Sequence, residues 1–562
     1  MKWRNIFNAE FDVIFSAALM IGFFSFLSKA LGILRNRIFA GEFGAGDTMD
    51  IYFAAFLIPD FLYSLLILGI LSSVFIPVFA EYEARNKEEA WRLANVVLTV
   101  FCTVFAVCAA VAAVFAPVLV ALVAPGFDGE KQAQTALLMR IMFLSPMLLG
   151  ASNIIGNMLQ ARRRFFTFAL APVMYNIGII IGALFLVKPF GVAGLAVGVV
   201  LGALLHFLIQ IPAVVQLGFS FKPEFTIRHP GLIKIAWLSL PRTVGLVANQ
   251  LNFVVVTAIA STVASGSIAV FYFANDLQFV PISIVALSFA SAVFPFLAAS
   301  YAKGEMDAFL NKLYDAINQI LYFVIPISLF LILMRAQLVR VLLGYGQFSW
   351  EDTRLTAAAV GAFAISIFAQ SLVPLFSRAF YALQDTKTPV VINIASTALA
   401  ALLSFYFLHL MTAGGDFARV VGAIFKVSDL AHASILALPL AFSSASVINL
   451  LALYFAFMVR VENFDSSRIV PSLFKINLAA SCMAVAVYGA LHIVAEWVNM
   501  QTFVGVFMQG GFALVAGAVV YGTASHMLRI PEFASVVQSF SLPVKRIFLS
   551  RIFPVSSSEE KQ

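Results

Sequence analysis

Residues 12–36 read DVIFSAALMIGFFSFLSKALGILRN, an apolar run whose second half carries a polar stripe. About 20 mostly apolar residues are enough to cross the hydrocarbon core of a bilayer as an α-helix. Lys2 and Arg4 precede the run, as they would in a signal peptide, but no small-residue cleavage site follows it. We therefore interpret this stretch as an uncleaved first membrane span.

The whole chain shares the apolar character of this stretch. Of its 562 residues, 62% are hydrophobic and 11% are charged, whereas about 25% of the residues in a soluble domain are charged. This composition excludes a cytosolic, secreted or nucleic-acid-binding protein. The net charge of +7 is typical of basic cytoplasmic loops. Because Cys102, Cys108 and Cys482 all lie in apolar stretches, they predict neither disulfides nor a metal site.

A window of about 20 residues predicts fourteen spans, and therefore an all-α polytopic membrane protein. The long apolar runs contain too much Gly and Pro, and too little alternation, for the strands of a β-barrel. Between the eleventh and twelfth spans, the charged segment 411–431 is predicted to be an external insertion or an interfacial helix. The predicted spans are 12–36, 50–79, 93–124, 135–160, 166–187, 191–216, 232–263, 267–299, 313–343, 355–383, 388–410, 432–459, 471–493 and 503–526.

The distribution of Lys and Arg predicts the orientation of these spans. With the N-terminus inside, inside segments hold 23 basic residues and outside segments hold 5, which is a strong positive-inside signal. Both termini are then cytoplasmic. The tail 529–562 mixes Phe with Lys and Arg, which suits an interfacial helix or a solvated tail equally well.

A weak internal repeat divides the chain. Val74–Pro77 closes the second span and Val293–Pro295 closes the eighth, at an offset of about 218 residues. Repeats with an even number of spans share one orientation and are related by an axis along the membrane normal. We predict lobes at 1–220 and 221–460, extra spans at 461–528, and a central cavity that suits alternating access better than it suits a channel.

Charged residues inside spans mark the candidate site, because each costs at least about 2.5–3.5 kcal/mol at mid-bilayer. In the first span, Ser28, Lys29, Arg35 and Asn36 share one helical face. We interpret this face as a cavity wall that attracts an anionic head group. The alternative is a basic helix end that snorkels to the interface.

The second span carries two acids with different expected roles. Asp50 begins it, and is expected either to pair with Arg35 or to contact the substrate. Asp60 follows Pro59, whose ring frees a backbone carbonyl and permits a bend. We predict a hinge with a polar lining at Pro59 and Asp60.

The seventh and eighth spans supply the remaining candidates. Arg242 is expected either to snorkel or to contact a head group, and Asn252, further along the same span, is a candidate for the cavity or gate. Asn275 and Asp276 lie deep in the eighth span, where Ile268–Ala302 holds no basic residue. A partner for Asp276 must come from another helix, and the candidates are Lys29, Arg35 and Arg242.

No enzyme signature appears. The chain lacks the G-x-x-x-x-G-K-[ST] phosphate-binding loop and the H-E-x-x-H zinc motif, and its six histidines are scattered. We predict a transporter without a cofactor or metal, driven by membrane potential or by an ion whose identity the sequence does not give.

Several segments resemble the MurJ (MviN) lipid II flippase family of the multidrug/oligosaccharidyl-lipid/polysaccharide exporter superfamily. The resemblance rests on these segments, in this order: Ser28–Arg35, Phe43–Gly46, Asp50, Ile58–Pro59, Phe75–Tyr82, Pro241–Arg242, Gln250–Asn252, Phe273–Asn275 and Gln384–Pro389. It implies two six-helix lobes plus two final helices in the bacterial inner membrane. It also implies a protein that moves an undecaprenyl-linked peptidoglycan precursor to the outer leaflet for cell-wall synthesis. We expect membrane lipids as further partners, and either a monomer or an association with cell-wall synthesis proteins.

The family likeness implies a basic cavity for the pyrophosphate and sugars, and a groove beside the last two helices for the polyprenyl tail. It places Lys29, Arg35, Asp50 and Arg242 at the head group, and the other polar candidates at the cavity or gate. Lys29 stands where the family has Arg. The arginines expected after Pro59 and in the eighth span are absent, as is the sodium-site acid in 388–410.

These departures leave other interpretations open. One is a polysaccharide-unit flippase or a multidrug or cation antiporter of the same fold, although the basic stripe disfavours a cationic cargo. Another is a membrane scaffold that transports nothing.

Overall fold

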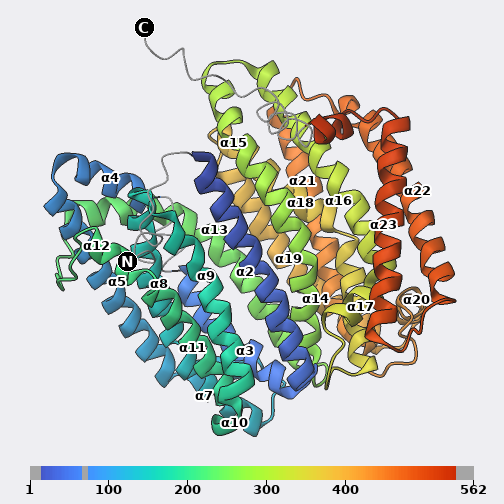
Figure 1. Cartoon of the computed structure of the whole chain (residues 1–562), viewed down its shortest axis with the longest axis horizontal. Coiled ribbons are helices and arrows are strands. Elements are labelled where there is room, and N and C mark those ends of the chain that lie inside the picture. Colours follow the sequence, from blue (N-terminus) through green and yellow to red (C-terminus); the bar gives the residue numbers. More distant parts are fainter. Residues whose placement is uncertain (1–13, 66–73, 539–562) are drawn as a thin grey trace, which may run out of the picture. The chain divides into compact units, whose positions relative to one another are not determined.

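The structure, a computed structural model, describes the backbone of residues 14–65 and 74–538, with side chains at 20–65, 74–239 and 250–538. Every regular element in those two backbone ranges is a helix (Figure 1). The all-α prediction is confirmed for this part of the chain.

The helices follow the order of the predicted spans. In the first half they are α2 (Ile14–Phe43), α3 (Asp47–Tyr63), α4 (Phe75–Arg85), α5 (Lys87–Val114), α6 (Ala116–Val123), α7 (Gly129–Met142), α8 (Leu144–Ala161), α9 (Phe165–Ile181), the π-helical turn η2 (Gly182–Leu186), α10 (Val187–Phe190), α11 (Ala193–Leu208) and α12 (Ile211–Gln216). In the second half they are α13 (Pro230–Ser261), α14 (Ser267–Pro281), the π-helical turn η3 (Ile282–Ala286), α15 (Leu287–Ala302), α16 (Met306–Leu342), α17 (Trp350–Ala364), α18 (Ile367–Ala382), α19 (Lys387–Thr412), α20 (Asp416–Phe425), α21 (Ala437–Arg460), α22 (Val470–Ala495) and α23 (Phe503–Met527).

Ten helical segments of the described chain are long and apolar enough to cross a membrane, and there are eleven if α17 and α18, bent by 45°, form one span. The other three predicted spans fall on α2, on α3 with α4, and on α13. Helix α2 carries three basic residues, 66–73 lie outside the described residues between α3 and α4, and the side chains of 240–249 in α13 are not described. The count of fourteen is compatible with this arrangement.

Close backbone contact joins α9 to α11. A Cβ atom added to Gly178 would lie 2.2 Å from Gly202 Cα, and one added to Gly182 would lie 2.4 Å from Gly198 Cα. Small residues four positions apart let membrane helices approach this closely. The glycine spacing in the two helices therefore fixes α9, which carries one of the site residues described below.

The helices form two compact units. Unit 1 consists of the described residues within 1–275, 342–359 and 393–445. Part of its core lies among α4, α5, α8 and α12, where Phe75, Phe79 and Phe105 are fully buried. The predicted lobes at 1–220 and 221–460, the extra segment 461–528 and the separate tail stay predictions.

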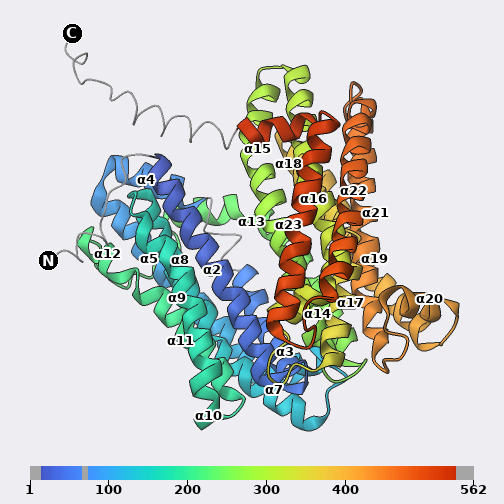
Figure 2. The same cartoon turned by 45° about the vertical axis from the view of Figure 1, so that its right-hand side comes forward.

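Unit 2 consists of the described residues within 276–341, 360–392 and 446–562. In it, α22 and α23 lie side by side in both cartoon views (Figure 2). Met334 of α16 packs with Met483 and Val487 of α22. The hydroxyl of Tyr521 on α23 donates to the carbonyl of Tyr322 on α16 at 2.6 Å.

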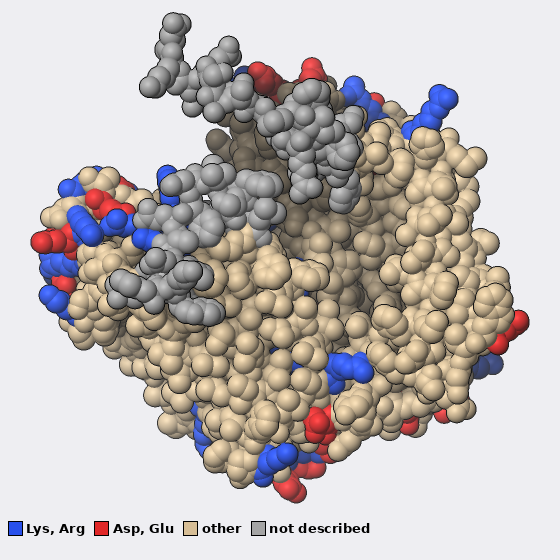
Figure 3. Space-filling model, viewed as in Figure 1, with Lys and Arg blue, Asp and Glu red and all other residues tan. Residues whose placement is uncertain are grey.

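The surface agrees with a membrane setting. The face in Figure 3 is largely tan, and charged residues gather over the end of unit 1 that holds α4 and α5. Within the predicted insertion, α20 is helical, and Arg354 of α17 holds the following loop through two hydrogen bonds to Asp429 of 2.6 and 2.5 Å. The location of α20 at the membrane interface stays a prediction. The tail is helical at 531–538, and 539–562 lie outside the described residues.

Candidate functional site

The polar stripe of α2 packs against an asparagine of α9. Asn176 donates through Nδ2 to the Oγ of Ser28 at 3.2 Å and to the backbone carbonyl of Ser28 at 3.3 Å. Its Oδ1 accepts from Nη1 of Arg35 at 3.4 Å. One amide therefore connects two members of the stripe that lie seven residues apart.

Arg35 is held from three sides. Its Nη2 and Nε donate to Asn36 Oδ1 at 2.9 and 3.2 Å, and its guanidinium carbon lies 5.9 Å from the centre of the Phe39 ring. The side chain is half-buried, whereas Lys29 is exposed. A guanidinium oriented by amide side chains and a ring is the kind of group that recognises an anionic ligand.

Asn176 is the site residue that sequence reasoning missed. It is 8% exposed, and a buried amide in an apolar helix needs partners because an unsatisfied polar group costs several kcal/mol. The signal in the sequence was a single amide within an apolar run. It did not point to Arg35, because the two residues are 141 positions apart.

Asp50 has a role that neither sequence alternative considered. Its Oδ2 accepts from the backbone nitrogen of Gly266 at 2.7 Å, and its Oδ1 accepts from that of Ala269 at 2.8 Å. These N–H groups begin α14, so a carboxylate of α3 caps a helix more than 200 residues away in sequence. Asp50 is 1% exposed, and both its oxygens face α14 in this conformation.

The geometry around this cap is tight. Gly266 adopts φ +82°, and a Cβ atom there would lie 1.8 Å from the carbonyl oxygen of Ala45. Only glycine fits both constraints. Nearby, Asp47 forms an ion pair with Lys131 at 2.8 Å. The start of α3 and the start of α14 are therefore fixed to each other.

Asp60 has a different kind of partner. Gln250 of α13 donates through Nε2 to Asp60 Oδ2 at 2.6 Å and to the Oγ of Ser64 at 3.2 Å. Pro59 is buried inside α3, as the hinge prediction requires, although bending itself is untested. At the place of the missing family arginine, Tyr63 accepts from Nδ2 of Asn153 at 2.6 Å.

The remaining candidates are placed to different degrees. Asn252 is 4% exposed, and its Oδ1 has no hydrogen-bond partner among the described residues. The side chain of Arg242 lies outside the described residues. Asn275 and Asp276 lie in α14 and are half-buried, and the boundary between the two units falls between them. The partner of Asp276 stays a prediction.

Comparison with known proteins identifies the family to which this chain is similar. The family described as "Lipid II flippase MurJ" matches residues 39–508. A probable lipid II flippase MurJ of Haemophilus influenzae is 27% identical over 523 residues, which cover 90% of this chain and 98% of that protein. A lipid II flippase MurJ of Burkholderia cenocepacia is 27% identical over 411 residues, covering 72% of this chain and 80% of that protein.

Solved structures show the same fold. A lipid II flippase MurJ in an inward-closed conformation superposes with a TM-score of 0.72 at 23% identity, covering 91% of this chain and 99% of that one. An inward-facing multidrug transporter of the MATE family gives a TM-score of 0.62 at 14% identity, covering 78% and 95%. Because the family match extends from the end of α2 to within α23 and covers most of the chain, the chain belongs to the MurJ family of lipid II flippases.

Proposed function

We propose that this chain moves lipid II from the cytoplasmic to the outer leaflet of the bacterial inner membrane by alternating access. The observation that carries the proposal is the basic face of α2, built into a fold and family of lipid II flippases. In it, Arg35 is oriented by hydrogen bonds to Asn36 and Asn176, and a guanidinium is the side chain that binds phosphate oxygens best. The cargo contains a diphosphate, which needs fixed cations along its path.

Lys29 and Arg35 divide the recognition between them. Arg35 offers a planar fork that binds two phosphate oxygens, and its amide neighbours fix the orientation of that fork. Lys29 is a flexible point charge on the exposed side of the same helix. We assign initial attraction to Lys29 and orientation of the diphosphate to Arg35, with Arg242 as a further cation of the head-group set.

Asp50 holds the start of α14 in place through both carboxylate oxygens, and its assignment to the head-group set stays a proposal. The gating set consists of Ser28, Asn36, Pro59, Asp60, Asn252, Asn275 and Asp276. Within it, Asp276 acts as a latch that pairs with a cation in one access state. An anionic head group that competes for that cation releases the latch and couples binding to the conformational change.

The energy source is the membrane potential or an ion gradient. One elementary charge that crosses 100 mV gains about 2.3 kcal/mol. Both termini are cytoplasmic in the proposed topology. Cysteines placed at 125–134, 346–353 and 496–502 therefore react with an impermeant reagent from outside, and those at 83–90, 303–310 and 462–470 do not. External labelling of the second set would reverse the orientation.

Complementation of a bacterial strain depleted of its own lipid II flippase tests the function. The wild-type chain should restore growth and cell shape, whereas Lys29→Ala and Arg35→Ala should each lose at least tenfold in lipid II translocation at equal protein level. Matched controls are Lys188→Ala and Arg419→Ala, which remove exposed cations away from α2. Full activity in both α2 variants would remove the head-group role.

A second cargo is favoured by one observation. The family arginine after Pro59 is missing, and the neutral pair of Tyr63 and Asn153 lies at that place. A polysaccharide unit with fewer charges would need fewer cations. If the depleted strain is not rescued while translocation of another lipid-linked oligosaccharide is restored, the polysaccharide-unit assignment replaces lipid II.

A further inference from the structure

The linker between α12 and α13 exposes an unusual set of side chains. Phe221, Phe225 and Ile227 are 55%, 57% and 59% exposed. Lys222 and Arg228 are exposed among them. Apolar and basic residues that alternate on one short segment suit the boundary between acyl chains and anionic head groups. A solvated linker would not require three large apolar residues.

Hydrogen bonds fix this linker to α5. Asn95 accepts from the backbone nitrogen of Lys222 at 3.0 Å and donates to the carbonyl of Ser220 at 3.3 Å. The Oγ1 of Thr99 accepts from the backbone nitrogen of Glu224 at 3.1 Å. The backbone of the linker therefore has a defined conformation against α5 in unit 1.

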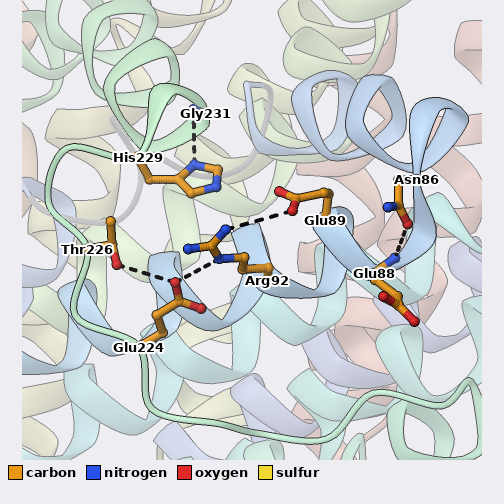
Figure 4. Close-up of polar contacts among 8 residues, drawn as sticks. All are labelled: Asn86, Glu88, Glu89, Arg92, Glu224, Thr226, His229 and Gly231. Atoms are coloured by element: carbon orange, nitrogen blue, oxygen red, sulfur yellow. Dashed lines mark hydrogen bonds and ion pairs between the residues drawn. The ribbon is translucent and has the colours of Figure 1, made fainter.

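The acidic residue of the linker is already engaged. Figure 4 shows the carboxylate of Glu224 facing Arg92, whose Nε donates to it at 2.8 Å, while the hydroxyl of Thr226 donates to the same oxygen at 3.3 Å. Arg92 also reaches Glu89 at 3.7 Å. Because Arg92 compensates the charge of Glu224, the exposed charges left on the linker are those of Lys222 and Arg228.

A cavity lies directly under the linker. It has a volume of about 430 Å³, and Phe219, Ser220 and Phe221 of the linker form part of its wall. The other walls come from α5, α8, α11 and α12, with residues such as Leu98, Cys102, Ala151, Ile155, Phe207 and Val214. The lining is apolar apart from the hydroxyl of Ser220, so a hydrocarbon chain is the ligand that matches it.

We propose that this cavity holds one acyl chain of an anionic membrane phospholipid whose phosphate lies between Lys222 and Arg228. The basic linker binds the phosphate of the lipid, and the apolar cavity beneath the linker binds an acyl chain of the same molecule. The lipid fills a void that would otherwise lose dispersion contacts, and it anchors the linker between the two predicted lobes to the leaflet. This site is separate from the face of α2.

Native mass spectrometry of the full-length protein tests the proposal. The purified, delipidated chain is mixed with phosphatidylglycerol or with phosphatidylcholine of identical acyl chains. We expect one phosphatidylglycerol to be retained at least tenfold more tightly than phosphatidylcholine. Lys222→Glu and Arg228→Glu should each lower retention of phosphatidylglycerol about fivefold or more, since each cation near an anionic surface contributes on that order.

A cavity-filling pair tests where the chain lies. Ala151→Phe fills the cavity and should abolish retention of both lipids, whereas Ala106→Phe, at an exposed position of α5, should leave retention unchanged. If Ala151→Phe does not accumulate, the reactivity of Cys102 replaces it, in a Cys108→Ser, Cys482→Ser background. Bound phosphatidylglycerol should slow modification of Cys102 by a maleimide at least fivefold.

Three outcomes would overturn the proposal. The first is equal retention in Ala151→Phe and Ala106→Phe, or, where Cys102 replaces Ala151→Phe, maleimide modification that the lipid does not slow. The second is equal retention of the two phospholipids. The third is displacement of phosphatidylglycerol by polyprenyl diphosphate at equal concentration, which would make the cavity a substrate site. None of these results depends on whether the chain transports lipid II.

Discussion

Asp50 and Asp60, two of the three acids of α3, differ in what holds them. Asp50, near the start of the helix, accepts two backbone N–H groups of α14 and is almost fully buried. Asp60, ten residues later, is held by one side-chain amide, that of Gln250. Backbone donors cannot leave without moving a helix, whereas an amide side chain can rotate away. From this comparison we expect Asp50 to stabilise the fold and Asp60 to exchange its partner during transport.

The largest effect should come from Asp50→Ala. The substitution leaves two buried N–H groups at the start of α14 without an acceptor and removes a charged cap, so we expect a loss of about 3 kcal/mol in the free energy of unfolding. Thermal unfolding and membrane yield measure it. Asp50→Asn keeps one acceptor and should lose about half as much. An alanine variant as stable as wild type would show that the cap is not needed.

Asp60→Asn should have an intermediate effect, on transport alone. The asparagine Oδ1 still accepts from Gln250, so stability should stay within about 0.5 kcal/mol of wild type. If the charge of Asp60 takes part in gating, lipid II translocation should fall about tenfold. Gln250→Leu is the matched variant, because it keeps the charge and removes the hydrogen bond. Normal translocation in Asp60→Asn would make this acid structural as well.

The smallest effect concerns a third polar contact, the N-cap of α13, whose acceptor is a titratable histidine ring. Nδ1 of His229 accepts from the backbone nitrogen of Gly231 at 3.1 Å. Burial, with a contribution from Arg92, lowers the pKa of His229, while Glu89 and Glu224 oppose the shift. Protonation of Nδ1 abolishes the cap. Since the unfolded value is about 6.5, the contribution of the cap is complete above that pH and is lost as the pH falls through the lower pKa of the folded chain.

Hydrogen exchange of the first turn of α13, corrected for intrinsic rates, measures this loss. Between pH 7.5 and pH 5 we expect protection to fall in the wild-type chain and to stay constant in His229→Asn, whose cap does not titrate. The same fall in both chains would assign the change to another group.

The features that could be predicted from the sequence are those that short stretches of the chain determine. Apolar runs gave the helices in the right order, and the spacing of Ser28 and Arg35 placed them on one face, because helix geometry is local. The partners of these residues were not predictable in the same way. Asn176 and Gln250 meet α2 and α3 from 141 and 190 residues away, and pairing at that distance depends on helix packing that no local pattern encodes.

Asp50 illustrates the limit. Its position at a helix N-terminus favoured a charge, and Arg35 was the nearest opposite charge in sequence. The structure uses the carboxylate for backbone groups instead, since the turn before α14 brings Gly266 against Ala45. When the capping residue comes from a distant helix, the sequence around that residue contains no capping motif.

The cap of α14 also has a consequence for how the chain is made. Asp50 and Gly266 are 216 residues apart, so a ribosome that adds 5–20 residues per second needs about 10–40 s to supply the second partner. During that interval the Asp50 carboxylate has no α14 to bind, and an unpaired acid in hydrocarbon is costly. We therefore expect the start of the nascent α3 to stay near the water interface until the second half of the chain arrives.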